Sequence, residues 1–183
     1  DDEAKHNLKE SFHVIEDQIA YMDKIVSDLQ AFVQPVNLEK KPLELQALLN
    51  NVLTTVVVPS NISVQINNHN IVPTINADPQ LIKRVLINLI TNAVQAMPNG
   101  GNLTLTAKIN SARHVSISVE DTGVGIGEKI KGQIFTPLFT TKPRGQGFGL
   151  AVCKRVIEAH GGTISFESQE GKGTTFTVKF PAN

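Results

Sequence analysis

An unbroken heptad pattern at the start of the chain constrains the fold more than any other feature. Residues 4–34 contain neither glycine nor proline, and apolar residues recur there in alternating steps of four and three. These apolar residues are Leu8, Phe12, Ile15, Ile19, Met22, Val26, Leu29 and Val33. A period of about 3.5 residues is typical of a bundle or coiled-coil seam, whereas a core helix face repeats about every 3.6 residues. One helix cannot bury this stripe on itself, so the pattern predicts a long helix that needs a partner helix.

Pro35 follows the heptad segment and ends the predicted helix, because proline cannot donate a backbone hydrogen bond. We therefore predict three parts: residues 1–34 as a helix of a coiled coil or helical bundle, 35–43 as a linker, and 44–183 as a second domain. The alternative is that the first helix packs into the core of the domain that follows it.

The charge is balanced over the whole chain but not within its parts. The 183 residues carry 17 Lys and Arg and 17 Asp and Glu. A net charge of zero argues against a nucleic-acid partner, which selects for a basic excess. Up to residue 34, three lysines face eight acidic residues, whereas after it fourteen basic residues face nine acidic ones. The basic second part is compatible with a phosphate ligand.

Cysteine usage and hydropathy predict the compartment. The single cysteine, Cys153, cannot form an internal disulfide, which favours a reducing, cytoplasmic compartment. The sequence has no apolar run of about 18 residues and no signal-peptide pattern at its start, so we expect no membrane contact from this chain.

Helical and strand patterns alternate through the second part. Helical periodicity covers residues 44–57, 78–97 and 150–159, and strand-like alternation covers 62–66, 102–109, 114–120, 163–168 and 174–180, with 74–77 as a further candidate strand. Asp78 before Pro79 is the expected order of an N-cap and a first-turn proline. This pattern predicts an α+β domain, a two-layer α/β sandwich with helices on one face of a mixed, mostly antiparallel sheet.

Residues 123–149, called the lid segment below, are rich in glycine and lack periodicity. The basic side chains in it, from Lys129, Lys131, Lys142 and Arg144, outnumber Glu128. A long loop inside a compact domain is usually a lid or a binding loop. Glycine and basic residues together suit a polyphosphate ligand.

Two common phosphate motifs are absent from the sequence. No G-x-x-x-x-G-K-[ST] string occurs, which excludes a P-loop. A dinucleotide fingerprint needs G-x-G-x-x-G opening a helix, but after Gly123 and Gly125 the third glycine, Gly127, comes one residue too early. We also predict no helix opening at Gly127.

Five separated elements offer a coherent alternative, at residues 88–93, 121–126, 135–142, 145–150 and 171–176. Asn88 and Asn92 share a helix face, and their carbonyl oxygens suit Mg²⁺. Asp121 precedes a glycine, so a flat ring could donate an amino group to its carboxylate. The glycines before Leu150 leave helix N–H groups free for phosphates. Singly, the asparagine pair reads as a polar helix face and Asp121 as a turn residue, but the ordered set favours a nucleotide site.

In this order the elements resemble the ATP-binding domain of the sensor histidine kinases of two-component systems. That domain belongs to the GHKL superfamily of gyrase, Hsp90-type chaperones, histidine kinases and MutL. The resemblance covers about residues 37–183, and helix 4–34 resembles the second helix of the dimerisation and histidine-phosphotransfer domain. It implies the Bergerat ATP-binding fold and a homodimer formed through the N-terminal helix.

The resemblance also implies residue roles and the cofactors ATP and Mg²⁺. Asn92 would bind the metal with Asn88 nearby, and Asn92 and Lys142 would take part in catalysis. Asp121 would bind the adenine amino group, with Thr174 in the same water network. The other expected nucleotide contacts are Gly123, Gly125, Ile126, Gly145, Gly147, Gly149 and Leu150.

Two departures from the family pattern modify these expectations. Phe148 replaces the usual leucine between Gly147 and Gly149, an apolar exchange that should preserve function. The His-Glu-[Leu/Phe/Ile]-Arg-x-Pro acceptor motif is missing, because His6 lacks the following proline. We therefore expect the chain to begin after the acceptor-histidine helix and to show no autophosphorylation alone.

The resemblance places the chain in a phosphorelay. The phosphoryl group would pass to a histidine on a neighbouring helix and then to an aspartate of a response regulator. Two other functions stay open: another GHKL ATPase or a serine kinase of the anti-sigma type, and a non-catalytic dimerisation module with a degenerate nucleotide site.

Overall fold

The computed structural model describes residues 2–68, 74–109, 114–142 and 147–181 of the chain. The chain divides into two compact units, Asp1–Pro35 and Val36–Asn183, which we describe separately. The predicted linker at residues 35–43 and the domain start at residue 44 stay predictions.

The first unit is one long helix, α1 (Asp2–Val33). The helix ends two residues before Pro35, as expected from the steric clash that proline makes with a helical predecessor. The eight side chains of the heptad stripe are between 45 and 68% exposed. A single helix cannot bury an apolar stripe on itself, so these side chains are exposed. The partner helix stays a prediction.

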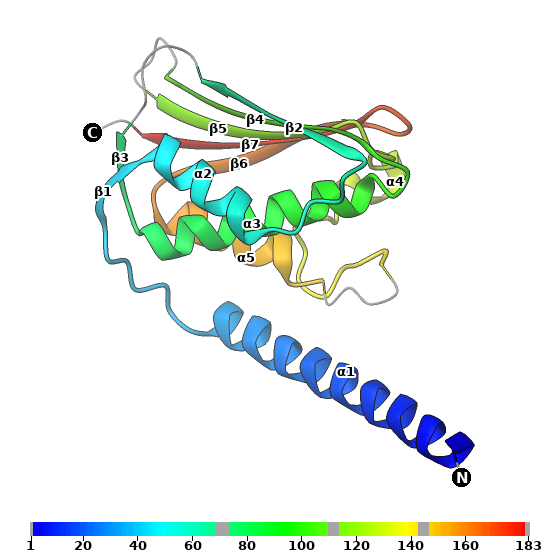
Figure 1. Cartoon of the computed structure of the whole chain (residues 1–183). Helices are drawn as coiled ribbons and strands as arrows, with labels where there is room; N and C mark the ends of the chain where they lie inside the picture. The colour runs from blue at the N-terminus through cyan, green and yellow to red at the C-terminus, as the bar shows by residue number, and fades with distance from the viewer. Residues whose placement is uncertain (1, 69–73, 110–113, 143–146, 182–183) are drawn as a thin grey trace. The chain divides into compact units, whose positions relative to one another are not determined.

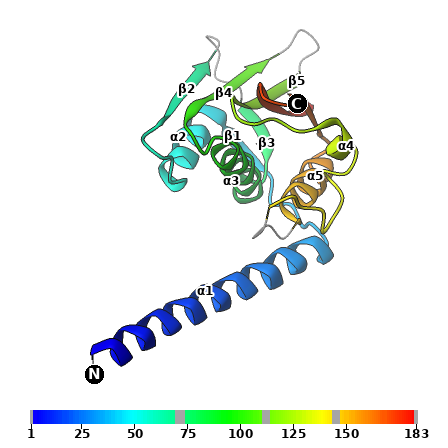
Figure 2. The ribbon, with the colours of Figure 1, turned by 90° about the vertical axis from the view of Figure 1, so that its right-hand side faces the viewer.

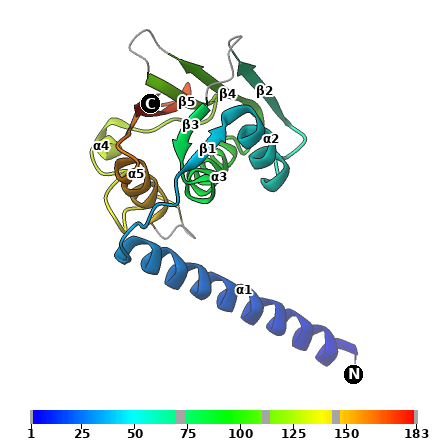
Figure 3. The same ribbon diagram turned by 90° about the vertical axis from the view of Figure 1, so that its left-hand side faces the viewer.

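The described residues of the second unit form two sheets (Figure 1). The strands are β1 (Lys41–Glu44), β2 (Ile62–Asn68), β3 (Thr74–Ala77), β4 (Gly101–Ile109), β5 (His114–Asp121), β6 (Thr163–Gln169) and β7 (Gly173–Pro181). The larger sheet has the order β2-β4-β5-β7-β6, in which β2 and β4 run parallel and the other pairs antiparallel. The strands β1 and β3 pair antiparallel in a small separate sheet (Figure 3). The predicted mixed, mostly antiparallel sheet is therefore confirmed.

Three helices cover one face of the larger sheet (Figures 1 and 2). They are α2 (Leu45–Thr55), α3 (Pro79–Ala96) and α5 (Gly149–Ala159). Alternate residues of the central strand β5, namely Val115, Ile117 and Val119, are at most 2% exposed and contribute to the core. The period of two in the strands and the apolar helix faces thus fix the two layers, and the predicted sandwich is confirmed.

The prediction that no helix opens at Gly127 is wrong. A single-turn helix, α4 (Glu128–Lys131), begins there with Gly127 as its N-cap residue. Four residues are too few to produce a readable helical period, which is why the sequence did not reveal it.

The start of α3 is held by a buried carboxylate. Asp78 is 7% exposed, and its Oδ1 accepts hydrogen bonds from the N–H groups of Gln80 and Leu81, at 3.0 and 3.1 Å. Its Oδ2 accepts a third bond from the N–H of Glu39 at 3.0 Å. Burial acts to raise the pKa of Asp78, but these three donors, together with the nearby His160, outweigh it and hold the pKa below 3.8. The predicted N-cap is therefore confirmed and also anchors the segment before β1.

A buried histidine, His160, connects α3 and α5. The backbone N–H of Asp78 donates to Nε2 of His160 at 2.9 Å, and Nδ1 of His160 lies 2.8 Å from the carbonyl oxygen of Val156. A carbonyl can only accept, so these contacts assign the proton to Nδ1. His160 therefore ties the C-terminal end of α5 to the start of α3.

No helix within the described ranges is long and apolar enough to cross a membrane.

Replacing Asp78 with alanine should lower the free energy of unfolding by about 1–2 kcal/mol, the usual cost of losing an N-cap. Urea denaturation at pH 7 measures this. Because the folded-state pKa is lowered, the ionised carboxylate contributes stability above its unfolded pKa, and this is lost as pH falls below 3.8. Asp78→Asn keeps a capping oxygen, so it should cost less at pH 7 and remove that acid-dependent loss. Equal stability of Asp78→Ala and the wild type would contradict this account.

Candidate nucleotide site

Asp121 lies at the end of β5 with its side chain buried. It is 4% exposed and stands opposite Thr174 in the antiparallel pairing of β5 with β7. Its carboxylate accepts the N–H of Gly123 at 2.9 Å and the backbone N–H of Thr174. Burial raises the pKa of Asp121 above 3.8, although these two donors oppose the rise, and the neighbouring Glu120 adds to it. A buried carboxylate of this kind is a candidate for recognising a hydrogen-bond donor on a ligand.

The position of Asp121 follows from the strand period. Asp121 is two residues beyond Val119 and four beyond Ile117, so it shares their helix-facing side of the sheet. The chain then leaves the strand, and the N–H of Val124 donates to the carbonyl of Ala96 at 2.9 Å. Asp121 is thereby placed beside the C-terminal end of α3.

Three glycines permit the close backbone approaches around Asp121. A Cβ on Gly123 would lie 2.4 Å from the carbonyl oxygen of Ala96. Gly125, with φ +69°, and Gly173, with φ +110°, leave no room either, since a Cβ would meet the backbone oxygens of Gln169 and Asp121 at 2.2 and 2.0 Å. These glycines are required for packing of the turn, and the predicted access of a ring at Gly123 and Gly125 stays a prediction.

Ser168 on β6 is a residue that the sequence reasoning missed. Its Oγ accepts the N–H of Ile126 at 2.8 Å and donates to the carbonyl of Gly173 at 3.0 Å. The same Oγ lies 2.9 Å from Oγ1 of Thr174, a residue that is 5% exposed. Strand alternation specifies only the side of the sheet on which a serine lies, so the sequence carried no signal for this network.

The two predicted catalytic residues contact one another. The Nζ of Lys142 donates to Oδ1 of Asn92 at 2.7 Å and to Oε1 of Gln95 at 2.5 Å. Nδ2 of Asn92 in turn donates to Oδ1 of Asn88 at 3.0 Å. One face of α3 thus presents amide oxygens to the cationic end of Lys142, and Gln95 is a second partner that the motifs had not indicated.

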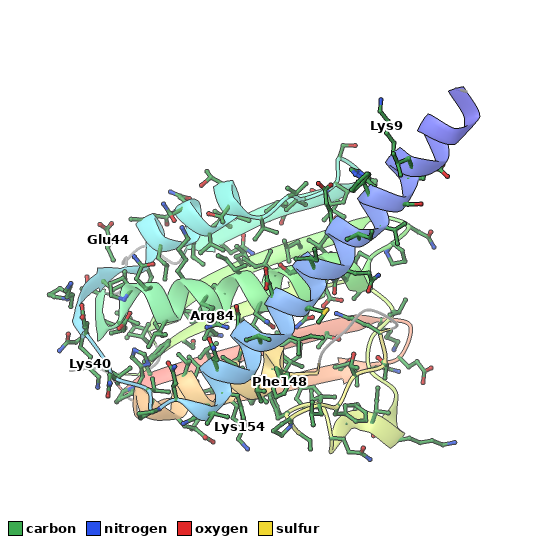
Figure 4. All side chains as sticks on the ribbon, turned by 90° about the horizontal axis from the view of Figure 1, so that it is seen from below. Lys9, Lys40, Glu44, Arg84, Phe148 and Lys154 are labelled. Atoms are coloured by element: carbon green, nitrogen blue, oxygen red, sulfur yellow. The ribbon has the colours of Figure 1, made fainter. Side chains whose placement is uncertain are left out.

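The asparagine pair also contacts the start of α5. A Cβ on Gly149 would lie 2.4 Å from Nδ2 of Asn88, so only glycine leaves this space. Phe148, labelled in Figure 4, is the N-cap residue and makes no side-chain cap. Because helix N-termini leave backbone N–H groups without intrahelical partners, this end of α5 has donors available next to Asn88. Leu150, in the first turn, is half-buried.

Much of the described lid segment packs on the sheet. Phe135 makes edge contacts with Phe166 and Phe176, with ring centroids 5.9 and 6.4 Å apart. The Nζ of Lys131 donates to Glu128 and, at 2.6 Å, to the backbone oxygen of Ser168. The side chain of Lys131 is therefore hydrogen-bonded to strand β6 of the sheet.

The later part of the lid segment contains a strained turn. Leu138 has a φ of +66°, and a Cβ on Gly147, itself at φ +72°, would lie 2.4 Å from the carbonyl carbon of Leu138. Gly147 therefore allows the two parts of the segment to approach. The predicted site residue Gly145, and Arg144 beside it, lie outside the described residues.

A sensor histidine kinase is among the curated proteins similar to this chain. The sensor histidine kinase ZraS of Escherichia coli strain K12 is 42% identical over 165 residues, which are 88% of this chain and 35% of ZraS. The chain therefore spans about a third of that relative's length.

Two solved structures resemble the fold. Full-length ShkA in complex with AMPPNP matches with a TM-score of 0.84 at 26% identity, covering 94% of this chain and 38% of ShkA. The histidine kinase ThkA in complex with the response regulator protein TrrA matches with a TM-score of 0.77 at 29% identity, covering 96% of this chain and 52% of the matched chain.

The family match covers the residues of the candidate nucleotide site. Residues 77–183, from the start of α3 to the end of the chain, match the family described as histidine kinase-, DNA gyrase B-, and HSP90-like ATPase. That span is more than half of the chain and contains Asn88, Asn92, Asp121, Ser168 and Thr174. The chain belongs to the histidine kinase-, DNA gyrase B- and HSP90-like ATPase family.

Proposed function

We propose that this chain is the catalytic, ATP-binding part of a sensor histidine kinase. It binds ATP and Mg²⁺ and transfers the γ-phosphate to a histidine on a neighbouring helix. A response-regulator aspartate then receives the phosphoryl group. The observation that carries this proposal is the buried Asp121 carboxylate, held by backbone donors beside the end of α3.

Asp121 suits an adenine ring. Its carboxylate accepts N–H groups from Gly123 and Thr174 and retains further acceptor capacity. The 6-amino group of adenine is a donor that would satisfy this capacity. Such a bond favours the ionised carboxylate and offsets part of the cost of its burial. Ile126, whose N–H is fixed by Ser168, borders the same turn.

Asn92 suits a magnesium ion. Its Oδ1 already faces a cation, the ammonium group of Lys142 at 2.7 Å. Among the residues that the structure describes, no three His, Cys, Asp or Glu side chains cluster as metal ligands. The ion would therefore be held by the amide oxygen of Asn92 and by nucleotide phosphates, with Asn88 orienting Asn92. When bound, Mg²⁺ would neutralise phosphate charge during transfer.

The start of α5 suits the phosphates. It has no side-chain cap, lies against Asn88, and presents backbone N–H groups with the positive end of the helix dipole. Lys142, from the lid segment, donates to the amide oxygen of Asn92 on α3. Its ammonium group could therefore contact a phosphate bound beside Asn92. We assign Gly147, Gly149 and Leu150 to this phosphate end of the site, together with Gly145.

The transfer itself requires positioning more than acid–base chemistry. The neutral imidazole nitrogen attacks the γ-phosphorus, the bond to the β–γ bridging oxygen breaks, and ADP leaves with the electron pair. The imidazole proton is then released to solvent. This chain's contribution is to hold the nucleotide in line and to stabilise charge with α5 N–H groups and Lys142.

The expected partners follow from the same proposal. The heptad stripe of α1 supports a homodimer, in which the acceptor-histidine helix from the same protein packs beside α1. The ThkA–TrrA complex supports a response regulator as the phosphoryl acceptor, and the AMPPNP complex of ShkA supports ATP as the nucleotide. Cys153 is 1% exposed and is the single cysteine of the sequence, so it forms no disulfide within the chain, which fits a cytoplasmic protein.

Asp121→Asn should abolish ATP binding while preserving the fold. Its amide nitrogen would place a donor against the adenine amino group. Since burial raises the pKa of Asp121, ionisation costs stability above pH 3.8, so the variant should unfold at an equal or higher urea concentration than the wild type at pH 7. Calorimetric titration with millimolar ATP, with and without Mg²⁺, measures the binding. Glu120→Gln, one residue earlier, is the control, and ATP binding by Asp121→Asn at wild-type affinity would refute this assignment.

Gly149→Ala should displace Asn88 and lower the affinity for Mg²⁺·ATP by at least about tenfold, the usual effect of losing a group that orients a metal ligand. The clash is with the end of a side chain, 2.4 Å away, so the fold should persist. Gly132→Ala is the matched control, because its Cβ would meet no atom within 4 Å. Equal magnesium-dependent affinities of the two variants would argue against a role for Asn88.

The chain should phosphorylate a supplied acceptor-histidine domain in the presence of Mg²⁺·ATP. Phosphohistidine is acid-labile, whereas phosphoserine survives acid, so acid treatment of the radiolabelled product separates a histidine kinase from a serine kinase of the anti-sigma type. An acid-stable label would favour the serine kinase. Nucleotide binding without any transfer would favour the non-catalytic module.

A further inference from the structure

We propose that Ser168 is a positioning residue that fixes the direction of the Thr174 hydroxyl and thereby makes the base site select a 6-amino purine over a 6-oxo purine. This inference rests on the proposed function and names a residue to which that proposal assigned no contact with the nucleotide. It is carried by three hydrogen bonds that meet at one oxygen atom.

The protons around Ser168 can be counted. Its hydroxyl has one proton and two lone pairs. The N–H of Ile126, at 2.8 Å, can only donate, so it takes one lone pair. The carbonyl of Gly173, at 3.0 Å, can only accept, so it takes the proton. The remaining lone pair faces Oγ1 of Thr174 at 2.9 Å, and Thr174 must therefore be the donor in that contact.

This arrangement commits the only hydroxyl proton of Thr174. With its proton directed at Ser168, Oγ1 of Thr174 can offer only lone pairs elsewhere. The Asp121 carboxylate accepts the backbone N–H of the same Thr174, and it too offers only lone pairs to a ligand. The base site is thus lined by two acceptors. A ligand edge that donates, as the 6-amino group of adenine does, fits them directly or through a water, whereas a 6-oxo group faces acceptors.

The surroundings keep Ser168 in place. Its backbone oxygen accepts the ammonium group of Lys131 at 2.6 Å, so β6 is tied to α4 at the same residue whose side chain holds the turn at Ile126. Thr174 is 5% exposed, so its hydroxyl depends on nearby partners such as Ser168. A buried hydroxyl that loses its partner is costly, which favours the single arrangement deduced above.

The test compares ATP with inosine triphosphate, which carries a 6-oxo group in place of the 6-amino group. Ser168→Ala frees the Thr174 hydroxyl to donate, so the affinity for ATP should fall about fivefold while that for inosine triphosphate stays equal or rises. Calorimetric titration or competition measures both. Ser168→Thr keeps the hydroxyl and should restore the preference for ATP. Ser165→Ala, at an exposed position of the same strand, is the control.

The preference ratio separates positioning from simple support of the fold. If Ser168→Ala weakens both nucleotides equally, or changes neither, the proposal is overturned. If the wild type binds ATP without any preference, the proposal is also overturned, while the proposed kinase function stands. If the wild type binds no nucleotide, the proposed function itself fails.

A second variant covers the case in which Ser168→Ala does not fold. Thr174→Val removes the hydroxyl that Ser168 orients, so it should reduce the preference for ATP by a similar factor. The double variant should then show no further loss, because both changes remove one interaction. Full additivity of the two effects would contradict the shared role.

Discussion

The antiparallel pairing of β5 with β7 is the constraint on which the site depends. Its register sets Asp121 opposite Thr174 and lets the backbone of one strand satisfy the carboxylate of the other. Burial alone would make a charged side chain costly at this position. The two backbone donors reduce that cost, but they do not cancel it, and the pKa of Asp121 stays raised. A ligand that donates a further hydrogen bond would stabilise the ionised carboxylate.

The helices connect this end of the sheet to the rest of the site. The cap at Asp78 and its link to His160 hold α3 and α5 against one another at one end of the helix pair. Farther along the two helices, Asn88 lies against Gly149. Asn88 accepts a hydrogen bond from Asn92, which in turn accepts one from Lys142. The proposed base-binding and phosphate-binding ends of the site therefore belong to one packed unit, and a change in the packing of α3 on α5 should affect both.

Features encoded locally could be predicted from the sequence, whereas features that depend on distant packing could not. Asp78-Pro79 encodes a helix start within two residues, and apolar alternation encoded both the central strands and their buried side. The role of Ser168 depends on three partners from distant parts of the chain, and nothing in its neighbours signals them. Gly123 was expected to admit a ring, but its immediate constraint is the backbone of Ala96. The parallel pairing of β2 with β4 and the single turn α4 likewise leave no readable period.

Amide chemical-shift mapping during titration with ATP tests the central claim most directly. ATP without metal should shift the backbone signals of Gly123, Ile126 and Thr174, and adding Mg²⁺ should then shift the side-chain amide signals of Asn88 and Asn92. Signals of the small β1–β3 sheet should stay unchanged. Shifts confined to that sheet or to α1, with the Asp121 turn and the asparagine pair unaffected, would contradict the account.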